Sequence, residues 1–97
     1  MINLVLRTAI VDADATARRE IKTALAGTDL VRLAAEHADC GSFPTSSELP
    51  DVVLVGVDAD TERALDLINR LARQFPACGV CAVSRSNDGQ LILRAIR

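Results

Sequence analysis

The centre of the chain reads Asp51-Val52-Val53-Leu54-Val55-Gly56-Val57. The six residues after the aspartate carry neither charge nor a hydrogen-bonding side chain, and four of them are β-branched valine. A short apolar run of this kind, with a proline and an aspartate before it, is typical of a strand that is buried on both faces. Such a strand lies inside a sheet, so we expect the other elements to flank it.

A helix is predicted directly after this strand, over residues 60–75. Asp60 or Thr61 is placed to cap its amino-terminal end, and Pro76 excludes helical geometry at Phe75. Its apolar residues recur three or four positions apart, as on one face of a helix. They are Ala64, Leu67, Ile68 and Leu71.

Two further elements are predicted toward the carboxyl end. Residues 80–83 form a short apolar run that ends at Ser84, which indicates a fourth strand. Asp88 is placed to cap a final helix. The side chains expected to face inward from that helix are Leu91, Ile92, Ala95 and Ile96.

The segment before the central run predicts a strand, a helix and a second strand. Residues 4–11 are almost entirely apolar, and residues 15–26 have helical periodicity, with Asp14 placed as the amino-terminal cap. Residues 31–35 alternate between apolar and polar, as expected of a strand near a sheet edge. Residues 37–50 contain glycine, proline and a run of hydroxyl residues, so we expect a loop with at most a turn or two of helix.

Strands that alternate with helices through short connections predict a parallel sheet wound by right-handed crossovers. Neither a bulge, a proline nor a lysine protects the fourth strand of this arrangement, and the last helix has no cap. We therefore expect one domain over residues 1–97 that is the amino-terminal part of a longer protein. A fifth strand and helix would then lie outside this segment.

Length and composition exclude several classes of function. The chain has 97 residues, a net charge of -2 and no apolar run long enough to span a membrane. An acidic balance argues against nucleic acid as a partner, because such binding uses a basic surface. We find no signal peptide at the amino terminus and an odd number of cysteines, three, which together predict a cytoplasmic protein.

Three stretches resemble the receiver domains of response regulators. Residues 9–18 resemble the first strand and the acidic loop that follows it, and residues 50–55 resemble the third strand. Residues 80–97 resemble the fourth strand, the switch hydroxyl and the start of the fourth helix. The resemblance implies a flavodoxin-like parallel sheet with strand order 2-1-3-4, lacking in this chain the fifth strand and helix of the family.

A narrower resemblance links the chain to pilus assembly. Residues 87–97, together with residues 58–60 and 64–68, are similar to the atypical receiver domain at the amino terminus of CpaE/TadZ-type pilus-assembly proteins. In that family the receiver-like module precedes a MinD/ParA-like ATPase domain, which this chain does not contain. The resemblance implies a role in placing the pilus machinery and recruiting partners.

The receiver resemblance also identifies a candidate site, which this chain has altered. It places Asp12 and Ala13 at the acidic pair that holds magnesium, Gly56 at the phosphoacceptor and Ser84 at the switch hydroxyl. Glycine has no side chain that could accept a phosphoryl group, and alanine offers magnesium no oxygen ligand. We therefore expect a degenerate phosphorylation pocket with no catalytic residue, no metal and no cofactor, in a protein that is not an enzyme.

Two functions remain open from the sequence. The first is a phosphorylation-independent module that binds a protein partner or a second copy of itself. The alternative is a working receiver that accepts its phosphoryl group on Asp58, two residues beyond Gly56 and on the same face of an extended chain. The simpler role for Asp58 is a solvated or helix-capping carboxylate, and for Asp12 a carboxylate that stabilises its own loop.

The spacing of Cys78 and Cys81 is that of a redox dithiol or of half a zinc site. Redox dithiols of this kind begin a helix, whereas these two cysteines precede and enter a predicted strand. Core packing is therefore the expected role of Cys81, and a thiol or zinc site is the third hypothesis.

Overall fold

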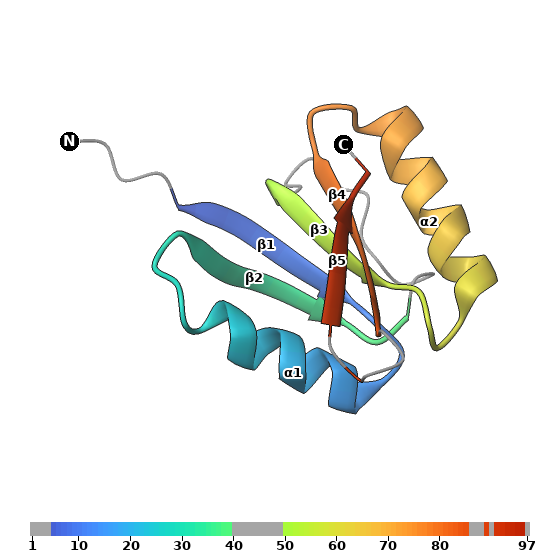
Figure 1. The fold of residues 1–97 in the computed structure, drawn as a ribbon. Coiled ribbons are helices and arrows are strands. Elements are labelled where there is room, and N and C mark those ends of the chain that lie inside the picture. The colour runs from blue at the N-terminus through green and yellow to red at the C-terminus, as the bar shows by residue number, and fades with distance from the viewer. Residues whose placement is uncertain (1–4, 40–49, 86–88, 90, 97) are drawn as a thin grey trace.

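The computed structural model describes residues 5–39, 50–85, 89 and 91–96. Within these residues the chain forms five strands and two helices (Figure 1). In chain order they are β1 (Leu6–Val11), α1 (Ala15–Leu25), β2 (Val31–His37), β3 (Val52–Gly56), α2 (Thr61–Gln74), β4 (Gly79–Arg85) and β5 (Leu91–Ala95). The predicted bounds of β1, β2, β3, β4 and both helices are correct to within a few residues, and most of the predicted loop over residues 37–50 lies outside the described residues.

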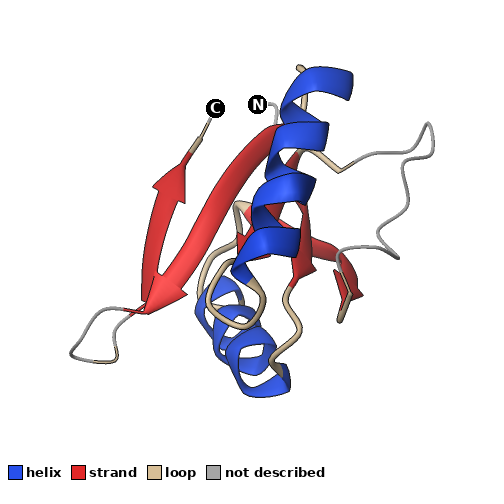
Figure 2. Cartoon of the chain, turned by 90° about the vertical axis from the view of Figure 1, so that its right-hand side faces the viewer, coloured by secondary structure: helices blue, strands red, loops and turns tan. Residues whose placement is uncertain are grey.

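All five strands belong to one sheet with the order β2-β1-β3-β4-β5. The first four strands in this order pair in parallel, as the flavodoxin-like prediction required. β3 lies in the middle with β1 and β4 beside it, which confirms that the apolar run at residues 52–57 is central. Because β1, β3 and β4 pair in parallel, their carboxyl ends lie at the same edge of the sheet (Figures 1 and 2).

The alternation of side chains along the strands divides the core into two clusters. On one face, α2 packs against β1, β3 and β4 through Ala9, Val11, Val53, Val55, Ala64, Leu67, Ile68, Leu71, Cys78 and Val80. On the other face, Ile21 of α1 packs against Ile10, Leu54 and Val83. The four apolar residues predicted for α2 are all buried in the first cluster, so the spacing in the sequence identified the inward face of this helix correctly.

Local chemistry accounts for where the helices begin. Oδ1 of Asp14 accepts a hydrogen bond from the Thr16 N–H at 2.9 Å, and Oδ1 of Asp60 accepts one from the Arg63 N–H at 3.3 Å. Both aspartates are thus amino-terminal caps, which satisfy backbone donors that have no partner inside the helix. Within the described residues, neither helix is long and apolar enough to cross a membrane.

The prediction for the carboxyl end was wrong in one respect, because residues 91–95 form a strand and not a helix. β5 pairs antiparallel with β4, from Arg85 opposite Leu91 to Cys81 opposite Ala95. A short apolar run fits a strand or a buried helix equally well, and the unpaired edge of β4 decides in favour of the strand. The sheet therefore has a fifth strand within this chain, and Asp88, the expected helix cap, lies outside the described residues.

Gly89, in the connection between β4 and β5, supports this correction. Its φ of 80° lies in the left-handed region, which suits a turn between antiparallel strands and not the first turn of a helix. A short connection of this kind can join antiparallel neighbours, whereas a parallel strand would need a crossover of a dozen or more residues.

We predict that Leu71→Ala destabilises the protein far more than Leu65→Ala. Leu71 is 0% exposed in the α2 cluster, whereas Leu65 on the outer side of the same helix is 49% exposed. Large-to-small changes at buried leucines cost about 2–5 kcal/mol, and exposed ones usually cost less than about 1 kcal/mol. Urea unfolding of the two variants measures the difference, and equal losses would contradict the assignment of the core.

Candidate functional site

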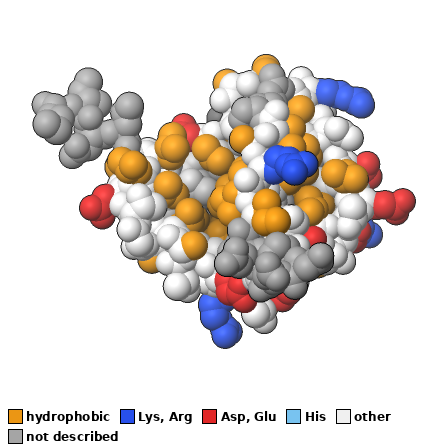
Figure 3. Space-filling view, in the orientation of Figure 1, with side chains coloured by type: hydrophobic (Ala, Val, Ile, Leu, Met, Phe, Trp, Pro, Cys, Tyr) orange, Lys and Arg blue, Asp and Glu red, His pale blue; other side chains and the backbone are white. Residues whose placement is uncertain are grey.

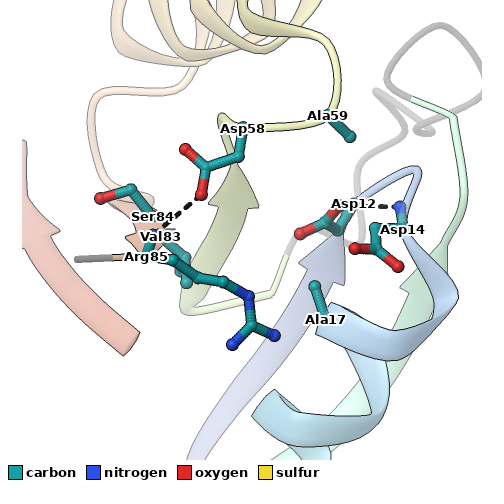
Figure 4. A pocket seen from close by; sticks show the side chains of 8 residues that line it. All are labelled: Asp12, Asp14, Ala17, Asp58, Ala59, Val83, Ser84 and Arg85. Carbon is teal, nitrogen blue, oxygen red and sulfur yellow. Dashed lines mark hydrogen bonds between the residues drawn. The ribbon is translucent and has the colours of Figure 1, made fainter. Parts of the chain in front are cut away.

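A cavity of about 190 Å³ opens at the edge of the sheet where β1, β3 and β4 end. Ligand sites of open α/β sheets occur at this edge, outside the carboxyl ends of the strands. The lining residues come from the loop after β1, the start of α1, the loop after β3 and the end of β4 (Figure 4). They are Asp12, Asp14, Ala17, Asp58, Ala59, Val83, Ser84 and Arg85.

Asp12 is the buried acid of this site, with only 5% of its surface exposed. Its Oδ1 accepts a hydrogen bond from the Asp14 N–H at 2.9 Å (Figure 4). Its carbonyl oxygen accepts one from Nη1 of Arg18 at 2.6 Å. Burial raises the pKa of the Asp12 carboxyl above its ordinary value of 3.8. The nearby carboxylates of Asp14 and Asp58 raise this pKa further, whereas the Asp14 N–H and the Arg18 guanidinium oppose the shift.

The other carboxylate oxygen of Asp12 lies directly against the backbone of Gly56. A Cβ atom built on Gly56 would overlap Oδ2 and Cγ of Asp12 and lie 3.0 Å from its Cβ. Gly56 has no positive φ, so glycine is required here for space and not for an unusual backbone conformation. The Asp12 carboxylate thus occupies the volume in which a side chain at position 56 would begin.

Asp58 forms a different kind of contact, across the mouth of the cavity. Its Oδ2 accepts a hydrogen bond from the Arg85 N–H at 2.8 Å, which ties the loop after β3 to the end of β4 (Figure 4). The Arg85 guanidinium forms an ion pair with Oε2 of Glu20 at 2.6 Å and donates a hydrogen bond to the carbonyl oxygen of Gly89 at 3.2 Å. Asp58 is exposed but is engaged by the backbone, and it does not cap α2.

Three of the five predicted site residues line the first cavity, and the other two line a neighbouring one. Asp12, Asp58 and Ser84 line the cavity described above. Ala13 and Gly56 line a second cavity, of about 160 Å³, between the end of β2 and the start of α2. The carboxylate of Asp12 stands over Gly56, so the first cavity is not lined by the position to which the receiver resemblance assigns the phosphoacceptor.

The donors present do not fit the magnesium ion of an active receiver. Magnesium takes oxygen ligands in octahedral geometry, usually one or two carboxylates with waters. Ala13 has no oxygen in its side chain, and one oxygen of Asp12 already accepts the Asp14 N–H. Across residues 5–39, 50–85 and the described part of the β4–β5 hairpin, no three His, Cys, Asp or Glu side chains converge as a metal site requires.

The two cysteines of β4 and its approach lie on opposite faces of the sheet. Cys78 packs in the α2 cluster and Cys81 lies beside the α1 cluster. Burial raises the pKa of both thiols, so neither has the stabilised thiolate that redox chemistry uses. This arrangement favours core packing over the thiol or zinc hypothesis.

The ion pairs around the site were not anticipated from the sequence. Arg18 and Lys22 of α1 both bind Glu36 of β2, at 2.9 Å and 3.0 Å, and Arg85 binds Glu20. The only signal in the sequence is the spacing of Arg18 and Lys22, which places two bases one turn apart on the same helix face. Their partners lie in other elements, and only the fold brings them into reach.

No protein-family model and no curated protein sequence matches the chain. Solved structures do match it in fold. RcsB from Salmonella enterica serovar Typhimurium, bound to the rprA promoter with the phosphomimetic BeF3-, superimposes with a TM-score of 0.71 at 16% identity, over 84% of this chain and 71% of that one. The isolated REC domain of RcsB from the same organism, with BeF3-, superimposes with a TM-score of 0.71 at 18% identity. The match covers 86% of this chain and 64% of that one. A structure of two RcsB dimers on two parallel DNAs superimposes with a TM-score of 0.73 at 16% identity. The match covers 86% of this chain and 44% of that one.

The chain has the fold of a receiver domain. It shares the strand order 2-1-3-4 and the crossover helices with these response-regulator structures, and it spans less than two thirds of the isolated REC domain. At 16–18% identity the likeness is one of fold, so the chemistry of the site is argued from this chain's own residues.

We predict that Gly56→Ala destabilises the protein by about 1–3 kcal/mol, because the new methyl group displaces the buried Asp12 carboxylate. Gly27→Ala is the matched control, since a Cβ at that position meets only the Ala24 carbonyl oxygen at an ordinary 3.6 Å. The cost of Gly56→Ala should fall in an Asp12→Ala background, which removes the overlapping oxygen. Additive costs in urea unfolding would contradict the contact.

A second prediction concerns the pH dependence of stability. Because the pKa of Asp12 is raised by folding, the folded state binds more protons than the unfolded state just above pH 3.8. The wild-type protein should therefore lose stability relative to Asp12→Asn as the pH rises from that value, until Asp12 is ionised in both states. Urea unfolding over an acidic-to-neutral pH series measures this difference, and a difference independent of pH would refute the prediction.

Proposed function

We propose that the chain is a receiver-fold interaction module that works without phosphorylation at the end of β3. One observation carries this proposal: the Asp12 carboxylate takes the space of a side chain at position 56. Phosphoryl transfer to a receiver needs an acceptor at that point with cationic groups to balance the phosphoryl charge. Here a glycine and a buried carboxylate stand in its place.

The contacts around the cavity support a fixed scaffold. Asp58 binds the backbone of Arg85, and the Arg85 guanidinium binds Glu20 on α1, so the loop after β3 is joined to the end of β4, and the end of β4 to α1. Asp12, Asp58 and Arg85 already have polar partners, and a hydrogen-bonded group gains little by exchanging its partner for a phosphoryl group. The surface of the scaffold, and not a reaction inside it, is then what the protein offers to a partner.

The proposed setting is the placement of pilus machinery in the cytoplasm, as the resemblance to CpaE/TadZ-type proteins implies. Two of the three RcsB structures were solved with DNA, one bound to the rprA promoter and one as two dimers on two parallel DNAs. This chain has a net charge of -2, which does not favour DNA as its own partner. A protein partner or a second copy of the chain fits its charge and its exposed apolar residues better.

One observation favours the alternative function, in which Asp58 accepts the phosphoryl group. Asp58 is exposed and lines the same cavity as Asp12 and Ser84, so it is the carboxylate best placed to receive a phosphoryl group from solvent. Against this role, one of its oxygens is held by the Arg85 N–H, and two further carboxylates line the cavity and repel an incoming phosphate.

We predict that incubation with acetyl phosphate and magnesium leaves the mass of the protein unchanged. Intact-mass spectrometry measures any gain, and an RcsB receiver domain treated in parallel serves as the positive control. A gain of one phosphoryl group that disappears in Asp58→Ala would establish the alternative function and contradict the proposal. A gain that persists in Asp58→Ala would contradict both.

An NMR titration with magnesium and beryllofluoride tests the same point without covalent chemistry. We expect the amide signals of Asp12, Gly56 and Ser84 to stay in place. Saturable shifts that cluster at these three residues would show that the pocket still binds a phosphoryl mimic.

A further inference from the structure

Two arginines stand side by side on neighbouring strands of the sheet. Arg7 is the second residue of β1, Arg32 is the second residue of β2, and the parallel register makes them partners. Neighbouring strands lie about 4.8 Å apart, and paired residues point to the same face. The two guanidinium groups therefore extend from adjacent positions on one surface, and both residues are exposed.

The packing of the core identifies that surface. Ala9, two residues after Arg7, belongs to the cluster that packs against α2, and its partner Ala35 on β2 packs against the same cluster. Side chains two positions apart along a strand share a face, so Arg7 lies on the α2 side of the sheet. Arg32 shares this face through its pairing with Arg7. This side of the sheet thus has an apolar centre and two exposed cations near the amino ends of β1 and β2.

Neither guanidinium has a partner among the described residues. In that part of the chain, the arginines that form ion pairs are Arg18, Arg63 and Arg85. Asp51, directly before β3, contacts Arg7 only through the backbone, because its Oδ2 accepts the Arg7 N–H at 2.8 Å. Like charges at paired positions of a sheet are destabilising. Arg7 and Arg32 therefore repel one another, and no ion pair within the described residues relieves that repulsion.

We propose that Arg7 and Arg32 together bind an acidic segment of a protein partner. A guanidinium presents a rigid fork of N–H donors that matches the two oxygens of a carboxylate. A carboxylate held between two such groups pairs with both and offsets their repulsion. The inference rests on the proposed function, a module that binds a protein, and adds the chemistry by which that protein is recognised.

The charge of the surrounding surface favours carboxylates of a protein over the phosphates of a nucleic acid. Nucleic-acid binding commonly neutralises roughly 6–10 phosphates with a continuous basic surface. On the face seen in Figure 3, the Lys and Arg side chains are scattered among acidic and apolar ones. The chain as a whole has a net charge of -2. Because exposed ion pairs contribute little and are screened by salt, we expect weak binding that strengthens at low ionic strength.

An NMR titration of the 97-residue chain with hexaglutamate, at low ionic strength, tests the proposal. We expect saturable shifts of the amide signals that cluster at Arg7 and Arg32. Arg19 of α1 and Arg73 of α2 are also exposed and form no ion pair with described residues, so they report on unspecific attraction. Equal shifts at all four arginines, or no shift at Arg7 and Arg32, would overturn the proposal.

A thymidylate oligonucleotide with six phosphates is the competing probe, because its charge equals that of the six glutamate side chains. We expect it to bind the arginine pair no more tightly than hexaglutamate does. Tighter binding of the oligonucleotide at Arg7 and Arg32 would assign the pair to phosphates of a nucleic acid and overturn the proposed partner.

Neutral substitutions test the two side chains directly. Arg7→Gln and Arg32→Gln should each raise the dissociation constant for hexaglutamate roughly threefold, as expected for the loss of one exposed ion pair. Arg19→Gln and Arg73→Gln are matched controls, because they change the net charge equally, and they should leave the constant nearly unchanged. Equal effects in the two sets would show that only the overall charge matters and would overturn the site.

Urea unfolding of the same variants tests the repulsion between the two arginines. Arg7→Gln and Arg32→Gln should each be at least as stable as the wild-type protein, and the double variant should gain less than the sum of the two, because either change removes the same repulsion. Additive effects would overturn the paired site. The unfolding curves also show that the variants are folded. None of these residues lies at the end of β3, so this proposal and the phosphorylation experiments above fail separately.

Discussion

The carboxylate of Asp12 packs against the backbone of Gly56, which has no side chain, and the arrangement of the site follows from that contact. The two residues end neighbouring parallel strands, so pairing of β1 with β3 sets them side by side. The absence of a Cβ at position 56 lets the carboxylate lie where it does, and burial there raises its pKa. The proposal that this module works without phosphorylation rests on that contact.

The groups around that contact join the elements of the fold. Arg18 connects the Asp12 carbonyl oxygen to Glu36 of β2, and Arg85 connects the end of β4 to Glu20 of α1. These ion pairs are partly exposed and contribute modestly to stability. Together with the hydrogen bond from the Arg85 N–H to Asp58, they join the loops after β1 and β3 to α1 and to the end of β4.

The apolar core explains why such a site tolerates change. α2 covers one face of the sheet with four buried side chains, and α1 covers the other with fewer. The fold therefore rests on aliphatic packing and does not depend on the acids at the strand ends.

The sequence by itself determined the four parallel strands, both helices and the cap at Asp14, and it limited the cap of the second helix to Asp60 or Thr61. These features depend on periodicity and on side chains within a few residues of one another, which a sequence displays directly. The tertiary structure alone decided that residues 91–95 are a strand, that Asp12 covers Gly56, and that Asp58 binds Arg85. Each of these contacts joins residues that are far apart in the sequence and close together only in the folded chain. Local sequence patterns do not indicate which distant residues come into contact.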